Sequence, residues 1–587
     1  MSDAVDRGAI PDAPAALRQL GDGAAVALAV ATWLGARSAL AVPVAVGGAV
    51  VAVALVGRRP VLLVLGCGVL AAGLGARSLA GLVPPDPRPV DAVATLVADP
   101  VAGDFDVRGE VRLDGRRLLV RADGGAGGSL RSARMGERVR VVGRLRPRPP
   151  GAAWMIPRHL AGQIDATSVE VADAGGPPWR AANRVRALIE QGARGMDRDD
   201  RSLYLGFVLG DDREQAATLV DDFRGSGLSH LMVVSGQNVA FILVLIGPVR
   251  TRLGWSGRWL VTLGVVVAFA AITRFEPSVL RASAMAVVAV SGQAVGRPAP
   301  AWRNLALAVT AMVLLDPLLT RSVGFQLSVA ATAAISLLAA PLAALLPGPR
   351  PVALAVATSA SAQLGVAPIL AGFAGGVPVT SLPANVLVGP AAALVTTYGL
   401  PAGLVAGVLG DPWAAPLHLP TVAGVRWAAL VARAGATAPL GELSLRHLAG
   451  LVLLAVVARW RPRLRSMLAV LAVAVLVLPA LALRSPPLRV AVGSGGSVWR
   501  SGGATVVVLP GRSRPATVLR DLRRAGVRRI DVLVVAGSSA PLLGPLRHRW
   551  TVAKVVDDDA RPGTLRVGDL EVVVRPPADA DVRRVPP

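Results

Sequence analysis

The sequence predicts a polytopic α-helical membrane protein of about 13 spans, with a β domain outside the membrane. Of its 587 residues, 53% are hydrophobic and 17% are charged, and the mean hydropathy of +0.55 is well above that of a water-soluble globular chain. The apolar residues gather in runs of about 17–25, the length that crosses a bilayer. The formal net charge of +24 comes almost entirely from arginine, which suits loops facing an anionic leaflet. The composition therefore excludes a single soluble enzyme.

Residues 1–84 are expected to form a tail and three membrane spans. The first apolar stretch begins late and has no clear cleavage site, so no signal peptide is predicted. Arg58 and Arg59 separate the second span from the third and place the N-terminus in the cytoplasm and residue 84 outside. The three spans are predicted near 24–36, 39–57 and 61–83.

Residues 85–178 change character and predict an extracytoplasmic β domain. Short β-branched runs are separated by glycine-rich turns, which is typical of a small antiparallel barrel or sandwich. Five or so short strands fit an OB-like barrel. The clearest runs are 93–98, 117–122, 138–145 and 166–172.

Residues 179–228 have the amphipathic pattern of helices that lie on the membrane surface or pack on a helical bundle. Ten further spans are predicted between residues 229 and 484, near 229–250, 258–274, 276–295, 303–319, 322–346, 351–373, 381–408, 418–437, 444–460 and 466–484. The arginine-rich loops between them all fall on the cytoplasmic side if the first of these spans runs inward. Residues 485–587 would then lie outside, like the β domain.

Polar residues inside the spans predict a polar mouth. A charged group at the middle of a spanning helix costs about 2.5–3.5 kcal/mol on insertion scales, so its presence needs a reason. We expect Arg281 to meet an anion and Asp316 to orient Arg281. The alternative is that these two residues pair to hold the bundle together and that the amides bond between helices. The residues expected at one membrane depth are His230, Ser235, Gln237, Asn238, Arg281, Asp316 and Gln326.

Asn385 follows Pro383 and is also assigned to the transport pathway. It is predicted either at a broken helix that lines a cavity or at a simple kink.

Three stretches resemble a known family. The string GSGLSHLMVVSG at 225–236 resembles the signature of the ComEC family, the inner-membrane channels of bacterial DNA uptake in natural transformation. The strings PSVLRA at 277–282, DP at 316–317 and GFQLS at 324–328 are similar to further elements of that family. The chain departs from the family pattern at Gln237 and Asn238, where Leu-His is usual, which puts in doubt any step that needs a titrating group there.

The resemblance implies that the protein passes single-stranded DNA into the cytoplasm. It also implies that the β domain is the family's OB-like domain and handles DNA outside the membrane. Phosphate contacts are assigned to Arg117, Arg121, Arg138 and Arg140. Aromatic side chains for base stacking are scarce, and a solvated basic barrel without DNA affinity is the alternative.

The resemblance further implies a C-terminal metallo-β-lactamase-like domain at 485–587. Where three histidines and one aspartate would bind metal, this chain has Gly537, Ser539, Pro541 and Leu542, none of which is a competent ligand. We therefore predict an α/β domain that has lost its metal site, no cofactor and no enzymatic activity.

The predicted function is an inner-membrane channel for single-stranded DNA. The expected partners are single-stranded DNA, membrane lipids, a separate DNA receptor and a cytoplasmic motor, since the chain has no Walker motif of its own. A small-molecule or lipid transporter would use the same polar mouth, and a membrane-bound nuclease would need metal ligands that the sequence lacks.

Overall fold

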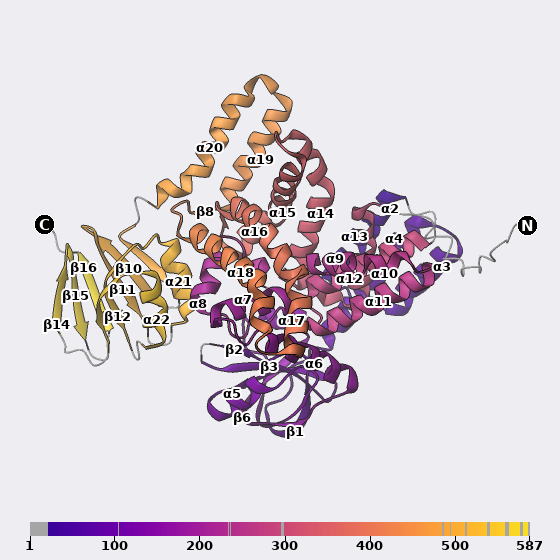
Figure 1. Cartoon of the computed structure of the whole chain (residues 1–587), viewed down its shortest axis with the longest axis horizontal. Coiled ribbons are helices and arrows are strands. Elements are labelled where there is room, and N and C mark those ends of the chain that lie inside the picture. The colour runs from indigo at the N-terminus through magenta and orange to yellow at the C-terminus, as the bar shows by residue number, and fades with distance from the viewer. Residues whose placement is uncertain are drawn as a thin grey trace, which may run out of the picture. The chain divides into compact units, whose positions relative to one another are not determined.

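The computed structural model describes most of the chain between residues 21 and 584. The described residues are 21–103, 105–232, 234, 236–294, 299–483, 487–493, 495–510, 513–536, 540–557, 563–575 and 579–584. The chain divides into two compact units, Met1–Arg184 with Gly236–Ala340, and Val185–Ser235 with Pro341–Pro587. Each unit therefore joins segments that are distant in sequence, as the colours of Figure 1 show.

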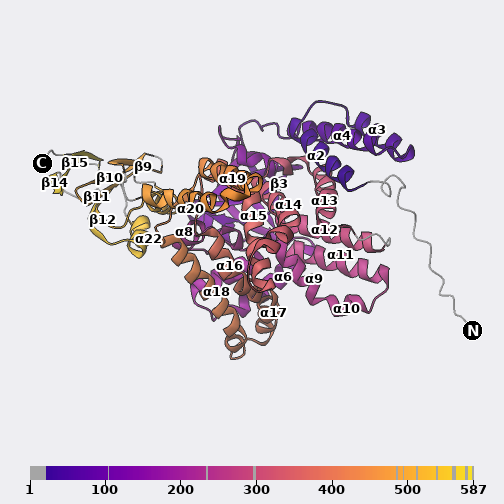
Figure 2. The same cartoon turned by 90° about the horizontal axis from the view of Figure 1, so that it is seen from above.

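The first unit begins with three helices that pack side by side (Figure 2). They are α2 (Asp22–Ser38), α3 (Val44–Val56) and α4 (Pro60–Ala80). Glycines permit the close approach, because a Cβ atom on Gly35 would lie only 2.0 Å from the carbonyl oxygen of Gly68. Small residues at helix contacts are typical of membrane helices. The structure thus has a helix at each of the three predicted N-terminal spans.

A closed β barrel follows. Strand β1 pairs with both β5 and β3, so the order β1-β5-β6-β4-β3 returns to β1, with the short β2 added beside β3. Strands β4 and β6 run parallel and the other pairs antiparallel. Alternate residues such as Val111, Val120 and Val139 fill the interior. The elements are β1 (Arg88–Leu96), β2 (Val101–Ala102), β3 (Val107–Leu113), β4 (Arg116–Ala122), α5 (Gly124–Ser132), β5 (Arg138–Pro147), η1 (Ala153–Arg158) and β6 (Leu160–Asp173).

The remaining helices of the first unit carry several of the predicted site residues. Helix α14 extends a few residues past the boundary of the unit. These helices are α9 (Gly236–Leu245), α10 (Gly247–Thr251), α11 (Trp255–Ile272), α12 (Pro277–Ala294), α13 (Ala301–Leu315), η3 (Pro317–Arg321) and α14 (Val323–Leu345).

The second unit holds the amphipathic segment and the later helices. Helix α6 begins in the first unit and ends in the second. Helix α7 buries Leu203, Tyr204 and Phe207 rather than lying with one face in solvent. The elements are α6 (Pro177–Gly192), α7 (Arg198–Leu209), α8 (Ala217–Gly225), η2 (Ser229–Leu231), α15 (Arg350–Ala374), β7 (Val377–Pro378), α16 (Ser381–Thr397), α17 (Gly399–Leu409), α18 (Ala414–Thr437), β8 (Glu442–Leu443), α19 (Leu445–Trp460), η4 (Pro462–Leu464) and α20 (Arg465–Ala482).

Five of the described helices are long and apolar enough to cross a bilayer. They are Pro60–Ala80, Trp255–Ile272, Val323–Leu345, Arg350–Phe373 and Ser381–Leu409, the last formed by α16 and α17 together. Four shorter apolar helices overlap other predicted spans. The structure is thus compatible with the predicted membrane class, and the count of about 13 spans stays a prediction.

The C-terminal segment forms an α/β domain with two sheets. The larger sheet has the order β13-β12-β11-β10-β9, and β14, β15 and β16 form a second, antiparallel sheet. Helices α21 and α22 pack on one face of the larger sheet, and the second sheet packs on the other. The elements are β9 (Arg489–Val492), β10 (Gly496–Ser501), β11 (Ala504–Leu509), α21 (Pro515–Arg524), β12 (Ile530–Val535), α22 (Ala540–Arg549), β13 (Val552–Val556), β14 (Gly563–Val567), β15 (Leu570–Arg575) and β16 (Asp579–Arg584).

Candidate functional site

Arg281 is a buried arginine near the start of α12 in the first unit. Its side chain donates a hydrogen bond from Nη1 to the hydroxyl of Thr332 on α14. The same nitrogen lies 4.0 Å from the sulfur of Met285, one turn further along α12. The residue is only 8% exposed, and Nε has no hydrogen-bond partner among the described residues. No described carboxylate forms an ion pair with this guanidinium.

The start of α9 packs directly against Arg281. A Cβ atom on Gly236 would lie 2.6 Å from Nη2 of Arg281 and 3.0 Å from the carbonyl oxygen of Ser278, so a side chain here would displace the guanidinium. Asn238, two residues further along α9, is buried. Ser235 and the side chain of Gln237 lie outside the described part of the chain.

The electrostatics of this contact favour an anion. Gly236 is the first residue of α9, so the partial positive charge of a helix N-terminus adds to the charge of Arg281. A buried cation without a carboxylate partner is costly, and an anionic group would relieve that cost. The predicted meeting of Arg281 with an anion stays a prediction, now with a described chemical environment.

Asp316 does not orient Arg281. Its carboxylate oxygen Oδ1 lies 2.9 Å from Nε2 of His159 and accepts a hydrogen bond of 3.0 Å from the backbone N–H of Leu318. Asp316 therefore caps η3, with Pro317 at the first helical position. The predicted pairing with Arg281 is wrong in this structure, because the Asp-Pro pair serves a local helix start and a distant histidine.

Gln326 supports the same short helix. Its side-chain amide donates a hydrogen bond of 2.9 Å to the carbonyl oxygen of Thr320, the residue whose carbonyl also accepts from Arg37 of α2. Asp316 and Gln326 thus hold η3 at its two ends, which is a structural task.

His230 and Asn385 come together in the second unit. The imidazole of His230 hydrogen-bonds with the side chain of Asn385 and with the backbone of Gly227. Helix α16 continues without a break from Ser381 to Thr397, so the break predicted at Asn385 is absent. Pro383 is tolerated there because it lies in the first turn, where its missing N–H has no helical acceptor.

The outer face of the barrel carries a row of arginines. Thr95 on β1 pairs with Arg138 on β5 and with Arg112 on β3, and Arg112 pairs with Arg117 on β4. We name Arg138, Thr95, Arg112 and Arg117 the arginine row. Their neighbours Leu96, Val111, Leu118 and Val139 point into the core, so the row faces outward. None of the three arginines forms an ion pair within the described residues. Arg112 stands directly opposite Arg117, so two like charges face each other on neighbouring strands.

The other two predicted DNA-binding arginines are neutralised. Arg121 pairs with Asp106 at 2.7 Å, and Asp106 also pairs with Arg108 at 3.0 Å. Burial alone would raise the pKa of Asp106, but the hydrogen bonds from Arg108 and Arg121 outweigh it and lower the pKa. Arg140 pairs with Asp91 at 2.8 Å. The four predicted DNA-binding arginines thus fall into two groups. Arg121 and Arg140 each have a carboxylate partner, whereas Arg117 and Arg138 have none among the described residues.

The C-terminal positions expected to have lost metal ligands are only partly described. Gly537, Ser539 and the side chain of Pro541 lie outside the described residues. Leu542 is 2% exposed and belongs to the apolar cluster under α22. The described residues contain no group of three or more histidine, cysteine, aspartate or glutamate side chains that could hold a metal ion.

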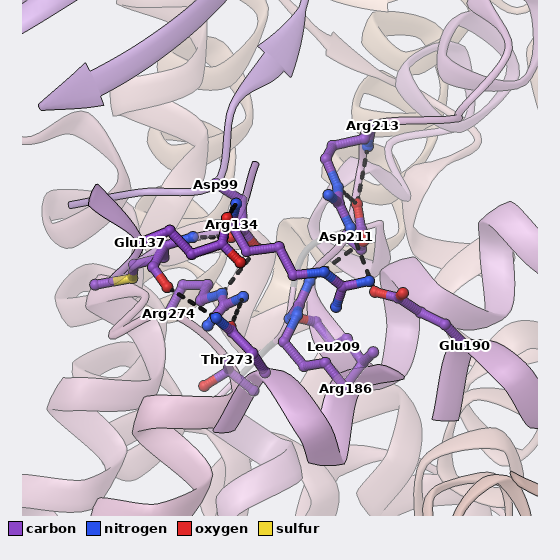
Figure 3. A network of polar contacts seen from close by, with 12 residues as sticks. Asp99, Arg134, Glu137, Arg186, Glu190, Leu209, Asp211, Arg213, Thr273 and Arg274 are labelled. Atoms are coloured by element: carbon purple, nitrogen blue, oxygen red, sulfur yellow. Dashed lines mark hydrogen bonds and ion pairs between the residues drawn. The ribbon is translucent and has the colours of Figure 1, made fainter. Parts of the chain in front are cut away.

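Sequence reasoning missed two buried ionic networks in the second unit. In the first, Asp211 accepts hydrogen bonds from Arg186 and Arg213 (Figure 3). Burial would raise the pKa of Asp211, but the contacts with Arg213 and the charge of Arg186 outweigh it and lower the pKa to about 2. The network fixes the turn between α7 and α8.

The second network joins α8 to the C-terminal domain. Arg523 of α21 lies 3.3 Å from Asp221, and Arg549 of α22 pairs with Asp222. Glu442 binds Arg523 and Arg524 from the other side. Burial raises the pKa of Asp222 in spite of the charge of Arg549. No sequence spacing links the partners, because Asp221 and Arg523 lie 302 positions apart and Asp222 and Arg549 lie 327 apart.

Comparison with known proteins bears on the helical region. Residues 207–465 match the family model described as competence protein. The matched range includes His230, Asn238, Arg281, Asp316, Gln326 and Asn385. No curated protein and no solved structure matches the chain. This match supports a relationship of the helical region to competence proteins of the ComEC type.

Proposed function

We propose that this protein is a bacterial inner-membrane channel that passes single-stranded DNA into the cytoplasm during DNA uptake for natural transformation. The observation that carries the proposal is the guanidinium of Arg281, which is buried at the start of α9 without a carboxylate partner among the described residues. A phosphate group is the anion that DNA would present there, and arginine binds phosphate through two parallel hydrogen bonds.

The arginine row on the barrel supports the same substrate. Like charges placed directly opposite on neighbouring strands are destabilising, and a polyanion would offset that cost. A groove or row of cations that follows the phosphates is how proteins bind single strands without reading their sequence. Stacking platforms are few, with Phe105 and Trp154 exposed on this domain.

The proposal includes an orientation and partners. The N-terminus would lie in the cytoplasm, and the barrel, proposed as OB-like, and the C-terminal domain would lie outside. Lipids would cover the apolar helices. A separate receptor would deliver the DNA and a cytoplasmic motor would pull it, since the sequence has no nucleotide-binding loop.

The proposal assigns no enzymatic reaction to the C-terminal domain, which we still regard as metallo-β-lactamase-like. Leu542 supports the loss of the metal site, because a leucine packed in the apolar core stands at one of the expected ligand positions. Zinc and manganese sites are built from imidazole, thiolate or carboxylate groups instead.

Replacement of Arg281 tests the proposed function. Arg281→Gln removes the charge but keeps hydrogen-bonding atoms, and we expect transformation to fall about 100-fold or more while the protein still inserts, given the cost of losing a buried charged contact. Arg281→Lys keeps the charge and should retain part of the activity. The matched control is Arg252→Gln, at an exposed arginine beside α10. Normal transformation by membrane-inserted Arg281→Gln would contradict the proposal.

A further inference from the structure

The turn between α11 and α12 is strained. Arg274 and Phe275 both have positive φ angles, of 63° and 57°. The backbone N–H of Phe275 bonds the carbonyl of Ala270, and that of Arg274 bonds the carbonyl of Ala271, which is the hydrogen-bond pattern of a Schellman helix end. Glycine is the usual residue at the position that Arg274 occupies, because a side chain makes the left-handed conformation costly. The side chain of Arg274 therefore needs a compensating role.

Arg274 clamps this turn to the barrel (Figure 3). Its Nε lies 2.8 Å from Oδ2 of Asp99, and its Nη2 donates a hydrogen bond of 2.7 Å to Oδ1 of Asn183. The side chains of Arg274 and Asp99 are 8% and 11% exposed. Asp99 also accepts from the backbone N–H of Met135, and Asn183 donates to the carbonyl of the same residue. We name Asp99, Asn183 and Arg274 the clamp.

Aromatic rings make a second contact between the α11–α12 turn and the barrel. Phe275 packs edge-on against Trp179, with ring centroids 5.9 Å apart. Trp179 in turn covers Gly136 of the barrel, where a Cβ atom would lie 2.3 Å from its ring. Both strained residues of the turn thus hold the barrel at the loop that precedes β5.

The clamp is close in sequence to the arginine row at one end and to Arg281 at the other. Asp99 follows Thr95 of the arginine row by four residues, and Met135 precedes Arg138 of the row by three. On the other side, α12 begins two residues after Phe275, and Arg281 is one turn into that helix. A change in β1 or β5 on DNA binding would therefore reach the clamp, and movement of the clamp would shift the start of α12.

We propose that the Asp99–Asn183–Arg274 clamp transmits occupancy of the arginine row by single-stranded DNA to α12 and so positions Arg281. Arg274 acts here as a positioning residue. The inference rests on the proposed function, because it requires that the barrel binds single-stranded DNA. It adds that the outer domain and Arg281 are energetically coupled, so that binding at one changes the state of the other.

The test is hydrogen exchange of the full chain in lipid nanodiscs, with and without an oligothymidylate. Arg274→Gly breaks the clamp and places glycine where the turn favours it, so the helix end should still form. The matched control is Arg58→Gly, because Arg58 also has a positive φ angle, of 53°, but is exposed and outside the clamp. The exchange double variant Asp99→Arg with Arg274→Asp restores the ion pair with reversed polarity.

In the parent chain and in Arg58→Gly, we expect oligothymidylate to slow exchange in both the barrel strands and the start of α12. In Arg274→Gly the barrel response should remain, and the α12 response should fall by roughly fivefold or more. The exchange variant should recover it. If DNA reaches Arg281 without help from the clamp, Arg274→Gly should leave the α12 response intact, and that result would overturn the clamp proposal.

The design separates the two proposals. A parent chain whose barrel shows no response to oligothymidylate contradicts DNA binding itself, and the clamp proposal falls with it. A parent barrel that responds while α12 does not contradicts only the clamp. Failure of Arg274→Gly to insert leaves the exchange variant as the deciding measurement, since a clamp that transmits binding requires it to restore the α12 response.

Discussion

Strands β3 and β4 of the barrel carry two pairs of opposed arginines, and only one of these pairs has a carboxylate partner among the described residues. Arg108 stands opposite Arg121 and Arg112 stands opposite Arg117, on the same two strands. Asp106 bridges the first pair, and no described carboxylate bridges the second. The first pair is therefore stabilised within the barrel itself, whereas the second leaves its charge available to a ligand.

We expect the double variant Arg112→Gln with Arg117→Gln to weaken binding of single-stranded DNA by the full chain. Each lost phosphate contact should lower the slope of log affinity against log salt by about 0.7. The matched control is Asp91→Asn with Arg140→Gln, which removes one charge of each sign from a surface ion pair and should leave the slope unchanged. Fluorescence anisotropy across a salt series measures both. Equal slopes in the two variants would contradict the assignment of the row.

The lowered pKa of Asp211 predicts that the free energy of unfolding depends on pH. Its pKa is lowered to about 2 in the folded chain from a usual value of 3.8, so the folded state holds this carboxyl ionised more firmly than the unfolded state does. The difference corresponds to about 2 kcal/mol at neutral pH, present above pH ~4 and lost as the pH falls toward 2.

Asp211→Asn should accordingly lower the Tm of the solubilised protein by several degrees, because it leaves Arg186 buried and its charge poorly compensated, at a cost of about 3 kcal/mol. Asp197→Asn provides the control, since that carboxylate is 77% exposed in its pair with Arg426 and should change stability by less than about 0.5 kcal/mol. The two variants are compared by thermal unfolding at pH 7. Equal Tm values would show that the buried network contributes nothing particular.

At the scale of elements, sequence patterning predicts some strands and misses others for physical reasons. Apolar runs predict β1, β4, β5 and β6, but β3 (Val107–Leu113) alternates with Arg108, Glu110 and Arg112, and its half-apolar pattern is easily passed over. The signal that could have found it is the Asp114-Gly115 turn, where both residues have positive φ and which fixes Arg112 opposite Arg117.

Long-range partners could not be predicted in this way. Asp316 contacts His159, which lies 157 positions away in the sequence, and Asp222 pairs with Arg549, which lies 327 positions away. No periodicity encodes such distances, because they depend on how completed elements pack. The left-handed conformation of Arg274 also carries no sequence signal, since glycine, which would mark it, is absent.

We expect the ion pairs of α8 with α21 and α22 to hold the C-terminal domain against that helix. Arg549→Leu would leave Asp222 buried without its ion-pair partner, which should cost about 3–5 kcal/mol and loosen the contact, while Asp221 keeps Arg523. Hydrogen exchange of α8 and α22 in the full chain should then speed up. Arg547→Leu, at an exposed arginine on the same helix, is the control and should leave exchange as in the parent. Unchanged exchange in Arg549→Leu would mean that the docking does not depend on these charges.

At the scale of the whole molecule, the arginine loops predict one side for both β-containing domains. Val171 of the barrel and His548 of the C-terminal domain are exposed, and Arg252 lies in a loop predicted to be cytoplasmic. The chain's single cysteine, Cys67, is 5% exposed and should not react. We expect an impermeant maleimide to label Val171→Cys and His548→Cys in intact spheroplasts, and Arg252→Cys only after permeabilisation. Labelling of Arg252→Cys in intact cells would reverse the proposed topology.

The closure of the barrel has a further consequence. Because β1 is bonded on both sides, the ring offers no free edge to another chain, and the added β2 is only two residues long. Exposed strand edges are the usual starting points of intermolecular β pairing and aggregation. Copies of this barrel therefore have little edge through which to join one another, because strand pairing with a neighbour could use only the two residues of β2.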